Sequence, residues 1–217
     1  MRPRRIPPGV RAVLPIAVTV PLFAISFGVL ARASGFGIAA PVVMSATTFA
    51  GSAQFAAVSI LDEDGGVAAA VVAALLLNAR YAALGVSVAS LFHGSFLRRL
   101  VEGQLIVDES WAVSARRDGT FDRQILLGAG LMLYALWVGG TALGVAGGGL
   151  VGDPERLGLD AAFPALFLAL LAGQLRTRRA VAAAFAGGGI ALALLPFMPP
   201  GVPIVAAVAG CLLGLRR

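Results

Sequence analysis

The stretch VAAAVVAALLLNARYAALGVSVASLF, residues 67–92, decides the fold class. It is apolar along almost its whole length, and its one charged side chain is Arg80. A helix that crosses a bilayer needs ~20 mostly apolar residues, and this stretch exceeds that length. The whole chain has the same character, because 59% of its 217 residues are hydrophobic and only 13% are charged. We therefore expect an all-α integral membrane protein.

Further apolar runs lie on both sides of this stretch. They cover residues 12–31, 36–61, 125–150, 161–175, 180–197 and 202–215. The first run is longer than the ~7–15 apolar residues of a signal peptide, so it is expected to be the first membrane helix. Only short polar pieces separate the runs. The sequence therefore predicts a single integral membrane domain over residues 1–217, with a basic tail at 1–11 and a cytoplasmic loop at 94–123.

Clusters of arginine set the expected orientation. They lie in the tail 1–11, in the loop 94–123, at 176–179 and at 216–217. Cytoplasmic loops of membrane proteins carry an excess of Lys and Arg, so all four clusters should be cytoplasmic. Seven full crossings cannot satisfy this condition. We expect about six transmembrane helices plus one re-entrant or broken segment, in a bacterial inner membrane, with both termini in the cytoplasm.

Two of the first three runs are candidates for the broken segment. Residues 36–61 contain Gly51-Ser52-Ala53-Gln54, and residues 67–92 contain Asn78-Ala79-Arg80 at their middle. Non-helical backbone at membrane depth is tolerated only where it lines a cavity or is buried in protein. The sequence leaves open which of the two is broken.

Composition excludes several classes of activity. All 17 cationic side chains are Arg, so a P-loop lysine and a Schiff-base lysine are both ruled out. His93 and Cys211 are the only residues of their kinds, which leaves no support for a His-ligated metal, a His-dependent triad or a CxxC motif. The net charge of +6 suits membrane orientation rather than nucleic-acid binding. We expect no cofactor, no metal and no enzymatic activity.

Arg80 is the most informative single residue. An arginine at the centre of a membrane helix costs ~2.5–3.5 kcal/mol, so it needs an anion or water. One interpretation is a structural ion pair with a carboxylate elsewhere in the bundle. Another is a receptor for an anionic group of a substrate. A third is that the segment is a hairpin and that Arg80 lies at shallow depth.

Gly51, Ser52 and Gln54 stand out in the segment 36–61 because they interrupt a run of small and apolar residues. They are consistent with hydrogen bonds between helices. They are also consistent with a helix that unwinds at Gly51 and Ser52 and exposes backbone groups to a polar ligand, as in transporters.

Two acidic residues also qualify as candidates. In a single helix through the loop 94–123, Asp108 would lie in the middle of the apolar face, where a carboxylate is expensive unless it is paired or functional. Alternatively, a helix ends or begins near Asp108, which would then be an N-cap. Asp160 precedes Ala161-Ala162-Phe163-Pro164, and it is a candidate N-cap or a candidate ligand.

Several motifs resemble the AzlC family, the large subunits of branched-chain amino acid exporters. They are Gly28-Val29-Leu30-Ala31, Gly35-Phe36, Phe49-Ala50-Gly51-Ser52-Ala53-Gln54-Phe55, Asn78-Ala79-Arg80-Tyr81, Asp108-Glu109-Ser110 and Leu159-Asp160-Ala161-Ala162-Phe163-Pro164-Ala165-Leu166-Phe167. They occur in order over about residues 12–175. Tyr81 and Trp111 depart from the family pattern, in which His and Phe are common at those places. The departure at Tyr81 weakens any argument for a His-dependent step.

The resemblance implies a secondary transporter subunit that exports small hydrophobic amino acids together with a small AzlD-type membrane subunit. A zwitterionic substrate would then meet Gly51, Ser52, Gln54, Asn78 and Arg80, with Asp160 and Phe163 as weaker candidates. An ion or proton gradient would supply the energy, and Asp108 would carry the coupled proton. Two other functions stay open: a structural or accessory membrane subunit, and a channel-like pore for a small polar solute.

Overall fold

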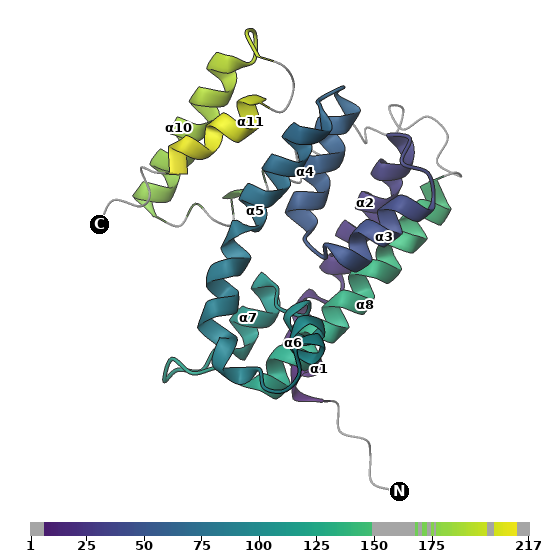
Figure 1. The fold of residues 1–217 in the computed structure, drawn as a ribbon, viewed down its shortest axis with the longest axis vertical. Coiled ribbons are helices and arrows are strands. Elements are labelled where there is room, and N and C mark those ends of the chain that lie inside the picture. Colours follow the sequence, from purple (N-terminus) through teal and green to yellow (C-terminus); the bar gives the residue numbers. More distant parts are fainter. Residues whose placement is uncertain are drawn as a thin grey trace, which may run out of the picture. The chain divides into compact units, whose positions relative to one another are not determined.

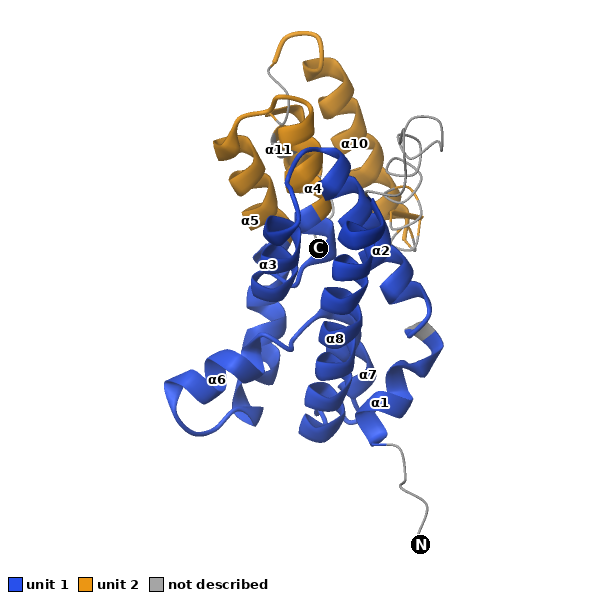
Figure 2. Ribbon diagram, turned by 90° about the vertical axis from the view of Figure 1, so that its right-hand side faces the viewer, with its two compact units in different colours: residues 1–54, 78–150 blue, residues 55–77, 151–217 orange. Residues whose placement is uncertain are grey.

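The computed structural model describes residues 7–148, 168, 171–172, 175, 177–198 and 202–211. No strand occurs among these residues, and Ala115 and Phe121 form one isolated antiparallel bridge. The all-α prediction is therefore confirmed for the part of the chain that the structure describes. The chain divides into two compact units, one of Met1–Gln54 with Asn78–Leu150 and one of Phe55–Leu77 with Val151–Arg217 (Figure 2).

Most of the described helices lie wholly in the first unit, and Figure 1 labels the longer ones. Those in the first unit are α1 (Pro8–Val13), η1 (Leu14–Ile16), α2 (Thr19–Ala33), α3 (Ala39–Thr47), η2 (Ala89–Leu91), α6 (Phe96–Gly103), α7 (Asp108–Ser114) and α8 (Arg123–Gly148). Two further helices, α4 (Gly51–Asp62) and α5 (Val67–Val88), begin or end in this unit and continue in the other.

Close packing of α2 against α8 forms the centre of the first unit. A Cβ atom at Gly28 would lie 2.7 Å from the backbone nitrogen of Val145, and one at Gly144 would overlap the carbonyl oxygen of Ile25. Only glycine permits such an approach, and small residues let membrane helices pack in this way. The Phe27 and Trp137 rings then stack between the helices, with their centroids 6.4 Å apart.

The break in the early membrane segments lies in residues 36–61. Helix α3 ends at Thr47 and α4 begins at Gly51, whereas α5 runs without interruption through Asn78 and Arg80. Between α3 and α4, Phe49 has a φ of 45°, a left-handed conformation that is uncommon for a bulky side chain. The hairpin interpretation of Arg80 is therefore wrong, since Arg80 lies inside a continuous helix.

Side chains from other elements satisfy the end of α3. The Gln104 amide donates to the Thr47 carbonyl over 2.8 Å, and the Tyr134 hydroxyl donates to the Ala46 carbonyl over 2.9 Å. The Tyr134 ring also packs edge-on against Phe49, with centroids 5.1 Å apart. Backbone carbonyl groups at an interrupted helix need hydrogen-bond donors where water is scarce. These contacts therefore hold the junction between α3 and α4 in place.

The loop 94–123 contains two short helices rather than one. Helix α6 ends at Gly103, and the backbone is extended at Val107 before α7 begins. The Ser110 hydroxyl accepts a hydrogen bond from the Val107 N–H, which satisfies a donor at the start of α7. The prediction of a continuous helix is therefore wrong. A helix does begin at Asp108, but Val107 occupies the N-cap position.

Two described helices are long and apolar enough to cross a membrane. They cover Val67–Leu91 and Arg123–Gly148, and Thr19–Ala33 is a shorter apolar helix. Most of the predicted segment 161–175 and the end of the predicted segment 202–215 lie outside the described residues. The number of crossings therefore stays a prediction.

The second unit contains α10 (Arg178–Leu194), α11 (Val202–Ala207) and η4 (Val208–Cys211). Thr177 caps α10, because its hydroxyl accepts a hydrogen bond from the Ala180 N–H over 3.1 Å. Gly187 of α10 meets Gly210 of η4 backbone to backbone. Close approach at glycine thus joins the helices of this unit as well.

Candidate functional site

Arg80 lies at the meeting point of three helices of the first unit. Its guanidinium is 2.9 Å from the Asp108 carboxylate of α7 and donates a hydrogen bond over 3.2 Å to the Ser52 hydroxyl of α4. The guanidinium carbon also lies 5.2 Å from the centre of the Tyr81 ring. The structure therefore brings together three predicted site residues that are far apart in the sequence.

The Arg80–Asp108 ion pair is open to its surroundings. The Arg80 side chain is 44% exposed and the Asp108 side chain is 45% exposed. A sealed structural pair would bury both groups, because a buried charge is tolerated only with its partners around it. The described part of this chain therefore leaves much of both side chains uncovered.

The site lies at the start of α4. Gly51 begins this helix, and the Ser52 hydroxyl accepts a hydrogen bond from Arg80. The N-terminus of a helix carries a partial positive charge, which favours a negative group nearby. The Arg80 guanidinium, the Ser52 hydroxyl and this helix end together suit a carboxylate.

Gln54 lies next to this site in sequence but in a different environment. Its side chain is fully buried, and its amide donates to the Ser45 hydroxyl over 2.8 Å. The Trp137 indole donates to the Gln54 carbonyl oxygen over 2.9 Å, and the Ser45 and Thr141 hydroxyls are 2.8 Å apart. The structure thus places Gln54 in a buried network that ties α3 and α4 to α8. This matches the interpretation of hydrogen bonds between helices.

Asn78 is the remaining predicted site residue that the structure describes. The side-chain oxygen of Asn78 is buried and has no hydrogen-bond partner among the described residues. An unpaired buried acceptor of this kind costs about 1–3 kcal/mol. Asp160 and Phe163 lie outside the described residues.

Comparison with known proteins identifies the family. The family model for AzlC protein matches residues 15–151. The chain belongs to the AzlC family. The match includes Gly51, Ser52, Gln54, Asn78, Arg80 and Asp108, whereas Asp160 and Phe163 lie beyond its end.

Relatives cover most of the chain. It is 37% identical over 210 residues to an uncharacterized membrane protein of Archaeoglobus fulgidus, covering 95% of this chain and 89% of that protein. It is 28% identical over 214 residues to the branched-chain amino acid transport protein AzlC of Bacillus subtilis, covering 92% of this chain and 83% of that protein. No solved structure matches the chain. Relatives of this chain are named as membrane proteins, and two of its described helices are long and apolar enough to cross a membrane.

Glu109 lies beside Asp108 in this candidate site, and the sequence did not single it out as a site residue. It follows Asp108 in α7, and its carboxyl is partly withdrawn from water although the residue keeps an exposed surface. This desolvation raises the pKa of Glu109, and the negative charge of Asp108 acts in the same direction. The sequence feature that could have identified Glu109 is the pair of adjacent acidic residues at the start of a helix.

Proposed function

We propose that this chain is the large subunit of a secondary transporter that exports small hydrophobic amino acids, and that Arg80 binds the substrate carboxylate. The observation that carries the proposal is the exposed Arg80–Asp108 pair at the first turn of α4. The Bacillus subtilis relative, named as a branched-chain amino acid transport protein, supports the choice of cargo.

Each part of a zwitterionic amino acid has a matching group near this site. The planar guanidinium of Arg80 binds a carboxylate at two points, and the Ser52 hydroxyl and the partial positive charge at the start of α4 also favour it. The Asp108 and Glu109 carboxylates offer acceptors for the ammonium group. The Tyr81 ring beside Arg80 gives the substrate side chain an apolar wall.

The same geometry suggests how a proton is coupled to the cargo. The ammonium group of the substrate needs the ionised Asp108 carboxylate beside Arg80, so the amino acid and a proton compete for Asp108. Protonation of Asp108 from the outside then releases the amino acid there, and loss of the proton to the cytoplasm lets the next amino acid bind. This exchange is what export driven by an inward proton gradient requires.

The remaining features of the proposal concern the assembly. The chain works with a small AzlD-type subunit, lies in the bacterial inner membrane and crosses it six times with both termini in the cytoplasm. The break between α3 and α4 is then the re-entrant or broken element that the arginine distribution requires.

A panel of labelled neutral amino acids tests the proposed function. Cells that lack the chain receive it alone, with its small subunit, or as Arg80→Lys with its small subunit. We expect lower accumulation of leucine, isoleucine and valine only with the unchanged pair. Equal accumulation in all three strains would refute export.

A purely structural role for the ion pair is the second candidate, because Arg80 and Asp108 are in contact. In that case each single leucine substitution lowers the amount of folded protein, because it leaves one charge unpaired within an apolar segment, and Arg80→Leu with Asp108→Leu restores it. A double variant that folds well and still exports would establish the structural role.

A further inference from the structure

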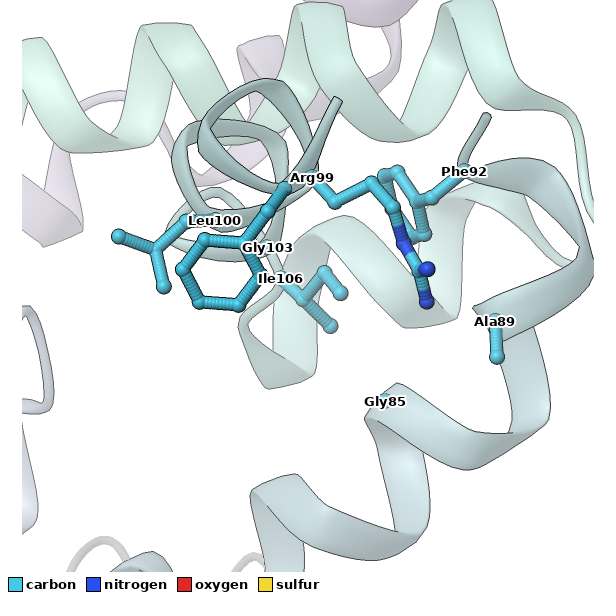
Figure 3. A pocket seen from close by; sticks show the side chains of 8 residues that line it. Gly85, Ala89, Phe92, Arg99, Leu100, Gly103 and Ile106 are labelled. Carbon is cyan, nitrogen blue, oxygen red and sulfur yellow. The ribbon is translucent and has the colours of Figure 1, made fainter. Parts of the chain in front are cut away.

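A pocket of about 400 Å³ lies between the end of α5 and the short helix α6, in the first unit (Figure 3). It shares no residue with the Arg80 site, and none of the described residues that line it is acidic. Its lining residues are Gly85, Ala89, Phe92, Phe96, Arg99, Leu100, Gly103 and Ile106. The pocket therefore combines apolar walls with a single cation.

Two of the residues that line the pocket, Phe92 and Ile106, are packed against a buried cluster. Phe92 belongs to a buried cluster with Val88 and Leu126, and Ile106 packs against the same cluster. The Trp111 indole, which also packs there, donates to the Ser87 hydroxyl over 2.8 Å. The side of the pocket formed by Phe92 and Ile106 is thus held in place by packing.

The position of the pocket along α5 places it at the edge of the membrane. The membrane-length helix ends at Leu91, and pocket residues come from its last turns and from the segment just after it. Helix α6 follows directly and exposes a row of large apolar side chains. They are Phe96, Leu97, Leu100 and Val101. An amphipathic helix of this kind lies in the interface between headgroups and acyl chains.

Arg99 differs from its neighbours in having no carboxylate. Arg98 and Arg123 both pair with Glu102. Arg99 forms no ion pair among the residues that the structure describes, and its side chain reaches across the pocket toward Phe92 and Ala89 (Figure 3). At the depth of the headgroups, its natural counter-ion is a phosphate.

We propose that this pocket binds an anionic phospholipid of the surrounding bilayer, with the phosphate on Arg99 and an acyl chain against Phe92, Leu100 and Ile106. The lack of a carboxylate in the lining argues against an amino acid, whose ammonium group would have no acceptor. The apolar walls argue against a free phosphate. An anionic amphiphile matches both the cation and the walls.

Retention of phosphatidylglycerol tests the proposal. The full chain is reconstituted in vesicles of equal phosphatidylglycerol and phosphatidylcholine and extracted in mild detergent, and the bound lipid is counted by native mass spectrometry. We expect the wild type to retain phosphatidylglycerol selectively. Arg99→Gln should lower this retention about fivefold, the effect of one arginine near an anionic surface.

Two further variants test whether the pocket itself is needed and whether loss of any arginine has the same effect. A Cβ atom at Gly85 meets nothing within 4 Å, so Gly85→Leu fits the fold but fills the pocket, and it should abolish retention. Arg117→Gln removes an equal charge from the exposed turn after α7, and it should behave as the wild type.

Several results would overturn the proposal. They are equal retention by Arg99→Gln and wild type, equal retention of phosphatidylcholine, and displacement of the lipid by millimolar inorganic phosphate. Loss of the bound lipid when the small subunit is co-expressed would show that a protein occupies the pocket instead.

Discussion

Arg80 lies in the middle of an apolar helix, and its guanidinium faces a carboxylate, a hydroxyl and open space. If it binds the substrate, Arg80→Lys keeps the charge but loses the planar two-point contact. We expect folding and membrane insertion to be preserved. Transport should fall roughly ten- to hundredfold, because each charge-assisted hydrogen bond contributes about 1.5–3 kcal/mol.

Leucine uptake into inverted vesicles, normalised to the amount of folded protein, measures this change. Arg117→Lys is the matched control, because it makes the same replacement at an exposed site outside the cluster. Transport by Arg80→Lys at the wild-type rate would show that charge alone matters at this position.

Glu102 gives a prediction about pH. Hydrogen bonds from Arg98 and Arg123 hold the pKa of the Glu102 carboxyl below its ordinary value. The stabilisation is therefore present above the unfolded-state pKa of ~4.3 and is lost as the pH falls through the lower folded-state value. Glu102→Gln should remove this part of the pH dependence. Thermal unfolding in detergent from about pH 6 to about pH 3 measures it.

The loss of stability in Glu102→Gln should disappear as the pH falls. Above the unfolded-state pKa the variant is less stable than the wild type, and toward low pH the two curves converge. Parallel curves across the whole range would mean that the two arginines do not stabilise the ionised carboxylate.

The sequence identified Arg80 and Asp108 as separate residues but did not place them together. A charged residue in an apolar run can be recognised from the sequence alone, whereas the 2.9 Å contact between Arg80 and Asp108 depends on how α7 packs against α5. Gln54 was equally visible, yet its partner Trp137 comes from another helix, and a tryptophan in an apolar segment gives no sign of its hydrogen bonds.

At the scale of helices, the contact between α2 and α8 depends on glycine. Gly144→Val should place its side chain against the α2 backbone at Ile25 and cost about 1–3 kcal/mol, the usual cost of overpacking. Gly139→Val is the matched control on the same helix, because a Cβ atom there meets nothing within 4 Å.

Thermal unfolding of the two glycine variants in the same detergent compares them directly. We expect a lower unfolding temperature for Gly144→Val and a value near the wild type for Gly139→Val. A similar loss in both variants would point to helix propensity rather than to the contact with α2.

Element boundaries show where sequence patterns stop being informative. The apolar content of residues 36–61 is continuous, so hydropathy alone could not place the break between α3 and α4. The deciding contacts come from Gln104 and Tyr134, which are distant in sequence. Similarly, the apolar periodicity of 94–123 continued across Gly103 although the helix ends there.

For the whole molecule, the arginine clusters make a topological prediction. With Cys211 replaced by alanine, single cysteines at positions 2, 98, 178 and 217 should all be labelled from the cytoplasmic side, because the positive-inside rule places every cluster there. A membrane-impermeant thiol reagent on intact cells and on inverted vesicles makes the measurement. Labelling of both 98 and 178 from outside would restore seven crossings.

The membrane class was predictable because composition fixes it, and the family match is consistent with it. The number of crossings was predicted from the charge distribution, which is a property of the whole chain. The two compact units were not predicted, since no linker or change of composition marks their limits in the sequence.

The central claim is that the substrate ammonium group and a proton compete for Asp108 beside Arg80. Leucine binding to the purified assembly, measured by calorimetry together with proton release across pH, tests it most directly. The wild type should bind leucine more weakly as the pH falls and release protons on binding under those conditions. Asp108→Asn should bind weakly and with little dependence on pH, whereas Glu109→Gln should keep the dependence on pH because Asp108 is unchanged. Equal dependence of leucine affinity on pH in Asp108→Asn and wild type would contradict the claim.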